Sequence, residues 1–257
     1  LEYSNGKIFG NFLRSENNLK LEPIKDYILD AHVNFQSSKP SFNLLINPSF
    51  YKNFNYNFLN AQNQNVLEIG GKVNLKWFES AVFANYFRID NYAYFDGSGL
   101  PKQSASSLNI SQIGGEATLK YWRINLNTKL LFQTALSQKE LFPMPNFVGR
   151  VNLFYQSMAF KDAAEIQTGI KVYYFSSFKS KDYFPVLNEF VLSANSSSIG
   201  GQPIADAYFN MKVKRMMIFA EAQHFNTTFM KNKSFAAPNF PLYDFRLNLG
   251  IVWYIFH

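Results

Sequence analysis

The chain has 257 residues, a formal net charge of +7 and no cysteine, which excludes a disulfide scaffold and a thiolate metal site. Aromatic residues make up 18% of the chain, and most of them are Phe and Tyr, which favour strands. No apolar run approaches the ~20 residues that a membrane-spanning helix needs, so a helical membrane protein is excluded. The Lys and Arg residues are dispersed, and we expect no nucleic-acid partner.

Apolar and polar residues alternate along most of the chain, and this period of two predicts β-strands. In 205–214, for example, Phe209 and Met211 fall on one face, whereas Asn210 and Lys212 fall on the other. No segment has helical periodicity with caps. We expect about twelve strands, at residues 6–14, 26–37, 41–53, 65–77, 79–91, 110–121, 122–135, 146–158, 162–176, 204–214, 215–226 and 242–256.

The connections between these segments alternate in length, which is typical of membrane barrels with short periplasmic turns and long extracellular loops. Short connections are expected near residues 38–40, 78–79, 122, 160–161 and 214–215. Long connections are expected near residues 15–25, 54–64, 92–109, 136–145, 177–203 and 227–241. If the last strand descends to the periplasm, 177–203 is one extracellular excursion that extends the wall or folds over its mouth without crossing the membrane.

Aromatic residues gather near the ends of the expected strands, as in Trp77-Phe78 and Tyr121-Trp122, and aromatic girdles at both membrane interfaces produce this pattern. The chain closes with an alternating strand that ends at Phe256-His257. Lipid tolerates no open sheet edge, so a barrel requires this last strand to pair with the first. The sequence thus predicts an all-β fold, a single antiparallel transmembrane β-barrel domain over 1–257. A soluble barrel or sandwich is the alternative that alternation alone leaves open.

Glycine pairs interrupt two of the expected strands in similar surroundings. Gly70-Gly71 is followed by a Lys-x-x-x-Lys-Trp segment, and Gly114-Gly115 by a closely similar one that ends at Tyr121-Trp122. Glycine inside a strand permits sharp curvature or the close approach of another backbone. The echo fits hairpins as the repeating unit.

The stretch from residue 200 onward resembles the C-terminal region of the putative porin family of Bacteroidota outer membranes. The resemblance is carried by Gly200-Gly201-Gln202-Pro203, by Asp206 to Arg215, by Ala220 to Asn226, by Phe235 to Leu242 and by Phe245 to Trp253. It implies an outer-membrane barrel in a Gram-negative bacterium. Members of that family are longer, which implies that N-terminal strands are missing and that the barrel is either closed as it stands or part of a larger one.

No constellation of residues predicts catalysis. The histidines, His32, His224 and His257, have no metal-ligand spacing and no carboxylate cluster, and a structural role is expected for His224. Serines lie in loops without a Gly-x-Ser-x-Gly elbow, and no His-Glu-x-x-His motif occurs. We therefore expect no enzyme activity, no cofactor and no metal.

Charged residues on the polar face of the strands are expected to line a lumen. These candidate pore-lining residues are Glu68, Lys72, Lys76, Glu116, Lys120, Arg123, Lys129, Arg150, Glu165, Lys171, Asp206, Lys212, Lys214 and Glu221. They can neutralise each other as cross-strand ladders. Because cations outnumber anions among them, a mild preference for anions is a second hypothesis.

Two functions follow for a membrane barrel of this size. The first is a porin-like passive diffusion channel for small polar solutes, and the second is a non-conducting subunit or anchor in a larger outer-membrane assembly, such as a secretion or motility complex. The expected partners are outer-membrane lipid, lipopolysaccharide, the barrel-assembly machinery acting on the C-terminal strand, and protein partners of such an assembly.

Overall fold

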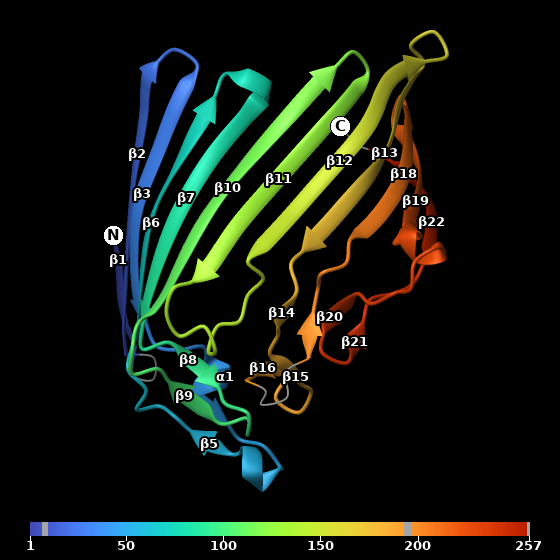
Figure 1. Cartoon of the computed structure of the whole chain (residues 1–257). Helices are drawn as coiled ribbons and strands as arrows, with labels where there is room; N and C mark the ends of the chain where they lie inside the picture. The colour runs from blue at the N-terminus through green and yellow to red at the C-terminus, as the bar shows by residue number, and fades with distance from the viewer. Residues whose placement is uncertain (7–9, 193–196, 256–257) are drawn as a thin grey trace.

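A single curved wall of antiparallel strands dominates the computed structural model, which describes residues 1–6, 10–192 and 197–255 (Figure 1). The wall is a 12-stranded sheet in which each strand pairs with its neighbours along the chain. Its strands, in order across the sheet, are β1 (Glu2–Gly6), β2 (Gly10–Ile24), β3 (Tyr27–Ser38), β6 (Gln64–Leu75), β7 (Ser80–Asp90), β10 (Leu108–Tyr121), β11 (Ile124–Ala135), β12 (Phe147–Ala159), β13 (Ala164–Phe175), β18 (Ile204–Val213), β19 (Met216–Gln223) and β22 (Arg246–Trp253).

Short turns join the strands at one end of the wall, and long connections join them at the other (Figure 1). We call these the turn end and the loop end. Two-residue turns such as Lys25-Asp26, Trp122-Arg123 and Lys214-Arg215 separate paired strands at the turn end. Asp26, Trp122 and Lys214 have φ of 73°, 53° and 51°, and positive φ matches the twist of a tight hairpin. The expected alternation of short and long connections is confirmed from β6 onward.

The long connections contain the remaining elements of the fold. These are α1 (Phe42–Leu45), β4 (Ile46–Asn47), η1 (Lys52–Phe54), β5 (Tyr56–Asn57), β8 (Ala93–Phe95), β9 (Pro101–Gln103), β14 (Phe178–Lys179), β15 (Asp182–Phe184), β16 (Glu189–Val191), β17 (Ser198–Ile199), η3 (Phe225–Thr228), β20 (Phe235–Ala237) and β21 (Phe240–Pro241). At the turn end, η2 (Trp77–Glu79) is a short helical turn. No helix in the described ranges is long and apolar enough to cross a membrane.

The expected strand 6–14 and the expected loop 15–25 are wrong. The described residues of 6–14 are divided between β1 and β2, and residues 7–9 lie outside the described part. Residues 15–24 are not a loop, because they continue β2 to Ile24. The polar residues of this stretch pair along β3, because one face of the strand does not need to be apolar. A strand of the wall can therefore be more polar than the alternation of apolar and polar residues led us to expect.

The expected strand 41–53, and the short connection expected near 38–40, are also wrong. Residues 39–63 form one long connection that carries α1, β4, η1 and β5. Pro40 and Pro48 supply no N–H to a ladder, which makes a central strand unfavourable here. Of the apolar residues in this segment, Leu45 is fully buried, whereas Phe50 and Tyr51 are exposed.

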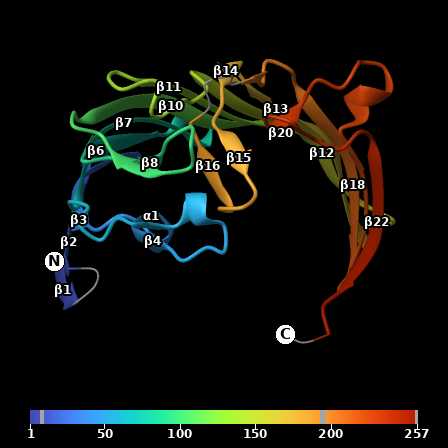
Figure 2. The same cartoon turned by 90° about the horizontal axis from the view of Figure 1, so that it is seen from below.

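The excursion between β13 and β18 agrees with its prediction. β13 and β18 are direct neighbours in the wall, so the segment between them does not cross as a strand. Within that segment β15 pairs with β16, and Val191 of β16 pairs with Phe95 of β8. Residues 193–196 lie outside the described part. The segment folds over the mouth at the loop end (Figure 2).

The wall bends into an arch and is not closed (Figure 2). β1 and β22 are its edges, and the expected pairing of the last strand with the first is absent from the described ranges. Glycines help the wall to bend inward. The ring of Phe83 lies over Gly114, and the ring of Phe219 lies over Gly250, so a side chain at either glycine would collide with the neighbouring strand's aromatic ring.

Candidate solute-lining surface

One face of the wall, which we call the outer face, carries exposed apolar side chains. They stand at alternate positions of many strands. Some are register neighbours on adjacent strands, and the others lie on the same face of the sheet as those neighbours. The most exposed include Ile69, Ile113, Phe132, Leu153, Phe209 and Leu249, of which Leu249 is 71% exposed. Water would make this much exposed apolar surface costly, whereas hydrocarbon would cover it favourably.

Aromatic residues border this apolar face at both ends. Trp77, Phe78, Tyr121, Trp122 and Phe160 stand exposed at the turn end. Near the loop end, Phe132 lies 4.8 Å from Phe147, measured between ring centroids, and Phe147 lies 6.0 Å from Tyr174. Aromatic residues favour the two interfaces of a bilayer, so the two groups mark the borders of a lipid-facing band.

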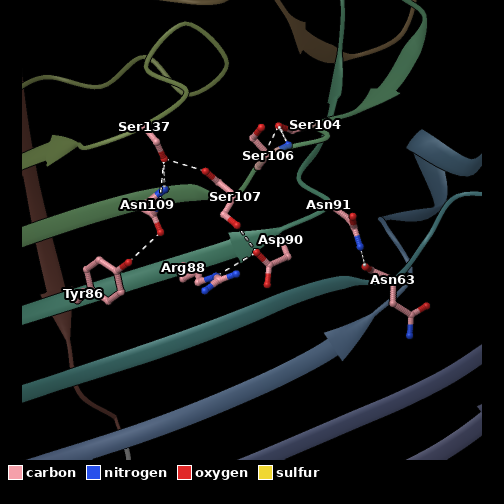
Figure 3. A network of polar contacts seen from close by, with 10 residues as sticks. All are labelled: Asn63, Tyr86, Arg88, Asp90, Asn91, Ser104, Ser106, Ser107, Asn109 and Ser137. Atoms are coloured by element: carbon pink, nitrogen blue, oxygen red, sulfur yellow. Dashed lines mark hydrogen bonds and ion pairs between the residues drawn. The ribbon is translucent and has the colours of Figure 1, made fainter.

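A polar network forms the loop-end border of that band on β7 and β10 (Figure 3). The hydroxyl of Tyr86 donates to Oδ1 of Asn109 at 2.8 Å, and Nδ2 of Asn109 donates to Oγ of Ser137 at 3.0 Å. Asp90 accepts hydrogen bonds from Arg88 at 3.1 Å and from Ser107. Polar groups that bond to each other and to solvent fit the headgroup level of a membrane rather than its hydrocarbon.

The opposite face of the wall, which we call the concave face, is identified by the loops. Leu108 and Ile110 share the parity of Glu116 on β10, and both are buried under loop residues that include Tyr92, Phe142 and Met144. In Figure 2 the loops that carry α1, β8, β15 and β16 lie inside the arch. The strand positions that carry polar residues therefore face into the arch, and the positions that carry apolar residues face outward.

Amide and hydroxyl side chains on the concave face bond to each other across strands. Nε2 of Gln112 donates to Oε1 of Gln133 at 2.9 Å, and Nδ2 of Asn127 donates to Oγ1 of Thr118 at the same distance. Farther along the arch, the hydroxyl of Tyr208 donates to Oδ1 of Asn152 at 3.2 Å. Such side chains keep spare hydrogen-bonding capacity, which suits a wet surface.

The candidate residues in the middle of the wall come together as ion pairs on the concave face. Nζ of Lys72 lies 2.6 Å from Oε1 of Glu116, and Nζ of Lys129 lies 3.4 Å from Oε2 of the same carboxylate. Lys171 lies 3.7 Å from Glu221. These contacts agree with the cross-strand charge ladder that the sequence predicts.

The other mid-wall candidates have different partners. Nη2 of Arg150 donates to Oδ1 of Asn127 at 3.0 Å. Glu68 lies 3.3 Å from Nε2 of His32 and accepts a hydrogen bond from Asn34 at 3.1 Å. The carboxylate of Asp206 accepts the backbone N–H of His224 at 2.8 Å, so it holds the start of a long connection.

The candidate residues near the turn end bond to residues of the turns or of a neighbouring strand. Lys76 pairs with Asp26 of the neighbouring turn at 3.0 Å, and Lys120 pairs with Glu79. Glu165 accepts a hydrogen bond from Gln156 at 2.6 Å, and Lys212 is its register neighbour. Lys214 lies in the turn itself, where its φ is positive.

Arg123 does not join the concave face. Its guanidinium lies 4.8 Å from the ring centroid of Trp122 and donates to the hydroxyl of Tyr155 at 3.1 Å. Tyr155 has the parity of the outer face, because it pairs with Ile124. Arg123 lies in a two-residue turn, where successive residues no longer alternate between the two faces. The alternation therefore predicted the wrong face for Arg123.

The prediction omitted several concave-face residues. Asp30 accepts a hydrogen bond from Asn74 at 3.1 Å, and His32 pairs with Glu68. Tyr208 lies beneath Lys171, whose Nζ is 4.5 Å from the ring centroid. The parity of their strands could have placed all of these on the polar face. Only the three-dimensional contacts assign them partners.

His224 is buried beside the wall, as its expected structural role requires. Its Nδ1 lies 2.6 Å from the backbone oxygen of Tyr243. Across the described ranges, no group of three His, Asp or Glu side chains is arranged to hold a metal ion. His257 lies outside the described part.

The long connections contact each other and form a layer across the loop end. Nδ2 of Asn43 donates to Oε1 of Glu189 at 2.8 Å, and the rings of Phe54 and Phe184 lie 5.1 Å apart. The ring of Tyr183 lies 5.4 Å from that of Phe240. We call this set of contacts the loop layer. It joins connections that are distant in sequence and narrows access to the concave face from this end.

Lys181 lies at the centre of the loop layer. Its Nζ donates to the hydroxyl of Tyr92 at 3.1 Å and lies 5.9 Å from the ring centroid of Phe142. Burial lowers the pKa of Lys181, and burial raises the pKa of Tyr92 to about 12. The three residues come from three different connections, so this contact binds them together.

Comparison with known structures places the wall among outer-membrane barrels. A ferric enterobactin receptor (PfeA) aligns with a TM-score of 0.65 and 15% identity over 91% of this chain and 38% of the receptor. A mutant of that receptor from Pseudomonas aeruginosa gives 0.62 and 14% over the same shares. The FrpB iron transporter from Neisseria meningitidis gives 0.61 and 11%, over 94% of this chain and 39% of that one.

At these identities the similarity shows the fold alone. The chain spans less than two fifths of the length of the receptors that it matches, with 38% of the first covered. No curated protein matches the chain. The family comparison is more specific, because the family described as Putative porin matches residues 1–257. The family match, together with the barrel-like fold, assigns an outer-membrane location. The chain therefore belongs to the putative porin family.

Proposed function

We propose that the concave face lines a water-filled passage through which small polar solutes diffuse passively across the outer membrane. The observation that carries this proposal is the contrast between the two faces of the same strands. Amides and paired charges such as Lys72 and Glu116 cover the concave face, whereas exposed apolar residues cover the outer face. A wall with this arrangement separates water from lipid.

The passage requires a closed wall, and the arch has two free edges. A lipid-exposed edge leaves backbone N–H and C=O groups without partners, which costs several kcal/mol for each group. We therefore propose that β1 and β22 pair with further strands or with a second copy in the membrane. We further propose that β22 is the strand recognised by the barrel-assembly machinery, and that lipopolysaccharide contacts the polar network of Tyr86 and Asp90 (Figure 3).

A specific observation favours a second candidate, a non-conducting subunit or anchor in a larger outer-membrane assembly. The loop layer lies inside the arch (Figure 2) and is fixed by contacts such as Asn43–Glu189 and Lys181–Tyr92. A layer of this kind can fill the mouth and present a folded surface to a protein partner. The two candidates differ in whether water and ions pass the loop layer.

Planar-bilayer recordings of the full-length protein separate the candidates. The diffusion channel predicts stepwise, ohmic conductance, and the anchor predicts none. The 257 residues contain no cysteine, so within them a single introduced cysteine is the only thiol and can report one face. In Gln112→Cys the thiol faces the passage and a charged methanethiosulfonate reagent should reduce the current. In Ile113→Cys, the matched control on the outer face, lipid should protect the thiol. Equal effects of the reagent on both variants would contradict the proposed passage.

A further inference from the structure

A row of charged side chains crosses the concave face from β2 to β12. We call it the charged row, and it consists of Lys20, Asp30, Lys72, Glu116, Lys129 and Arg150. Lys20 and Asp30 are register partners, as are Asp30 and Lys72. Positive and negative residues alternate along the row as far as Lys129. Such alternation is the stable arrangement for charges that face each other across strands.

The connection from Lys72 to Glu116 crosses an intervening strand. β7 lies between them, and it places the small residue Ala81 opposite Glu116. Lys72 is opposite Phe83, two residues farther along β7, so its side chain reaches Glu116 diagonally across that strand. Nζ of Lys72 reaches Oε1 of Glu116 at 2.6 Å. The carboxylate of Glu116 is therefore shared between Lys72 and Lys129.

The alternation fails between Lys129 and Arg150. These two cations are direct register partners on β11 and β12. The nearest carboxylate is Glu116, which lies 3.4 Å from Nζ of Lys129 and is shared with Lys72. Within the described ranges, no carboxylate lies within ion-pair distance of Arg150, whose Nη2 donates instead to Oδ1 of Asn127 at 3.0 Å. Like charges directly opposite each other are unfavourable.

The two cations are also open to the concave side. The side chain of Lys129 is 53% exposed, and Arg150 is exposed as well. Among the register neighbours of Arg150 is Tyr173, which adds a hydroxyl group to the surroundings. The surface around the pair is thus polar, accessible and short of negative charge.

We propose that Lys129 and Arg150 form a binding site for a small oxyanion of the phosphate type. This inference rests on the proposed function, because it assumes that the concave face is bathed in water. A planar guanidinium binds two oxygens of one phosphate in parallel, and the ammonium of Lys129 supplies a point charge beside it. The bound anion takes the place that a carboxylate occupies elsewhere in the charged row. A passage with such a site would select for phosphate-bearing or similar dianionic solutes.

Calorimetric titration of the detergent-solubilised full-length protein with inorganic phosphate tests the site, with chloride at equal ionic strength as the comparison arm. We expect phosphate to bind more tightly than chloride. Arg150→Gln should weaken phosphate binding about tenfold, because it removes a charge-assisted pair of hydrogen bonds. Glu116→Gln should tighten it, because both lysines then lose their competing carboxylate. A gain of affinity cannot result from misfolding.

Lys212→Gln is the matched control, since it removes one positive charge from the turn end of the same wall, where Lys212 is a register partner of Glu165. Phosphate affinity should stay within about twofold of that of the natural protein. Equal weakening by Lys212→Gln and Arg150→Gln would overturn the site in favour of a diffuse positive field. Absence of phosphate binding, or no gain with Glu116→Gln, would also overturn it.

The same preparation distinguishes this inference from the proposed function. Phosphate binding without bilayer conductance would support the site and remove the diffusion channel. Conductance without phosphate binding would retain the channel and remove the site.

Discussion

The outer face and the concave face are made by the same strands, yet their side chains interact in opposite ways. On the outer face, residues such as Ile113 and Leu249 are more than half exposed. On the concave face, polar residues such as Gln112 and Gln133 bond to each other. The comparison teaches that each strand serves two solvents, and that a shift of one residue in register would exchange them.

A charge on the outer face should have the largest effect. Ile113→Lys should destabilise the protein by about 2–4 kcal/mol, because a cation within the lipid band loses its hydration. Gln112→Lys, one residue away on the concave face, should change stability by less than about 0.5 kcal/mol. Urea-induced unfolding of the full-length protein in lipid vesicles measures both. Similar costs for the two variants would mean that the faces do not meet different solvents.

The two glycines of one pair should respond differently to a side chain. At Gly114 on the concave face, a Cβ would meet the ring of Phe83 and the backbone oxygen of Leu130 at 2.7 Å. Gly114→Ala should therefore cost about 1–3 kcal/mol through overpacking. At Gly115 on the outer face, the nearest atom is the backbone oxygen of Ala81 at 3.4 Å, and Gly115→Ala should cost much less.

The same unfolding assay compares the two alanine variants. If Gly115→Ala destabilised the protein more than Gly114→Ala, the close approach of Phe83 would not be what requires a glycine there.

The smallest expected effect concerns the loop layer and its dependence on pH. Burial lowers the pKa of Lys181, so the unfolded layer binds more protons than the docked layer. Docking should therefore strengthen as the pH rises from the lowered pKa of Lys181 in the folded layer toward the ordinary lysine pKa of 10.5. Tyr92 opposes this at higher pH, because its pKa of about 12 means that docking weakens as the pH rises from 10.0 through that value.

Hydrogen exchange of residues 176–192, measured at several pH values, tests the loop layer. Lys181→Met keeps the length of the side chain and removes the charge, so protection near neutral pH should increase slightly and its rise toward pH 10.5 should vanish. Lys102→Met is the control, because Lys102 is an exposed loop lysine that pairs with Asp96 at 2.8 Å. An unchanged pH profile in Lys181→Met would exclude Lys181 as the cause.

Much of the wall could be predicted from the sequence, and the errors have a common cause. The strands from β6 onward follow the alternation closely, because one face meets lipid and must be apolar. The prediction failed at 15–24 and 41–53, where polarity and local apolar content were misleading. The polar end of β2 is a strand because β3 pairs with it, whereas 41–53 adds no strand to the wall because β3 already pairs with β2 and β6. Pairing involves distant residues that local periodicity does not report.

By itself the sequence determined the all-β wall, the alternation of short turns with long connections beyond residue 64, and the aromatic residues at the strand ends. These are local properties, because side chains alternate strictly along a strand and turns are chosen by a few adjacent residues. Only the tertiary structure decided which face lies inside the arch, since that depends on where loop residues such as Tyr92 bury Leu108. It also decided that Lys72 and Lys129 share Glu116 while Arg150 has no carboxylate partner within the described ranges, because ion pairing is set by register between strands.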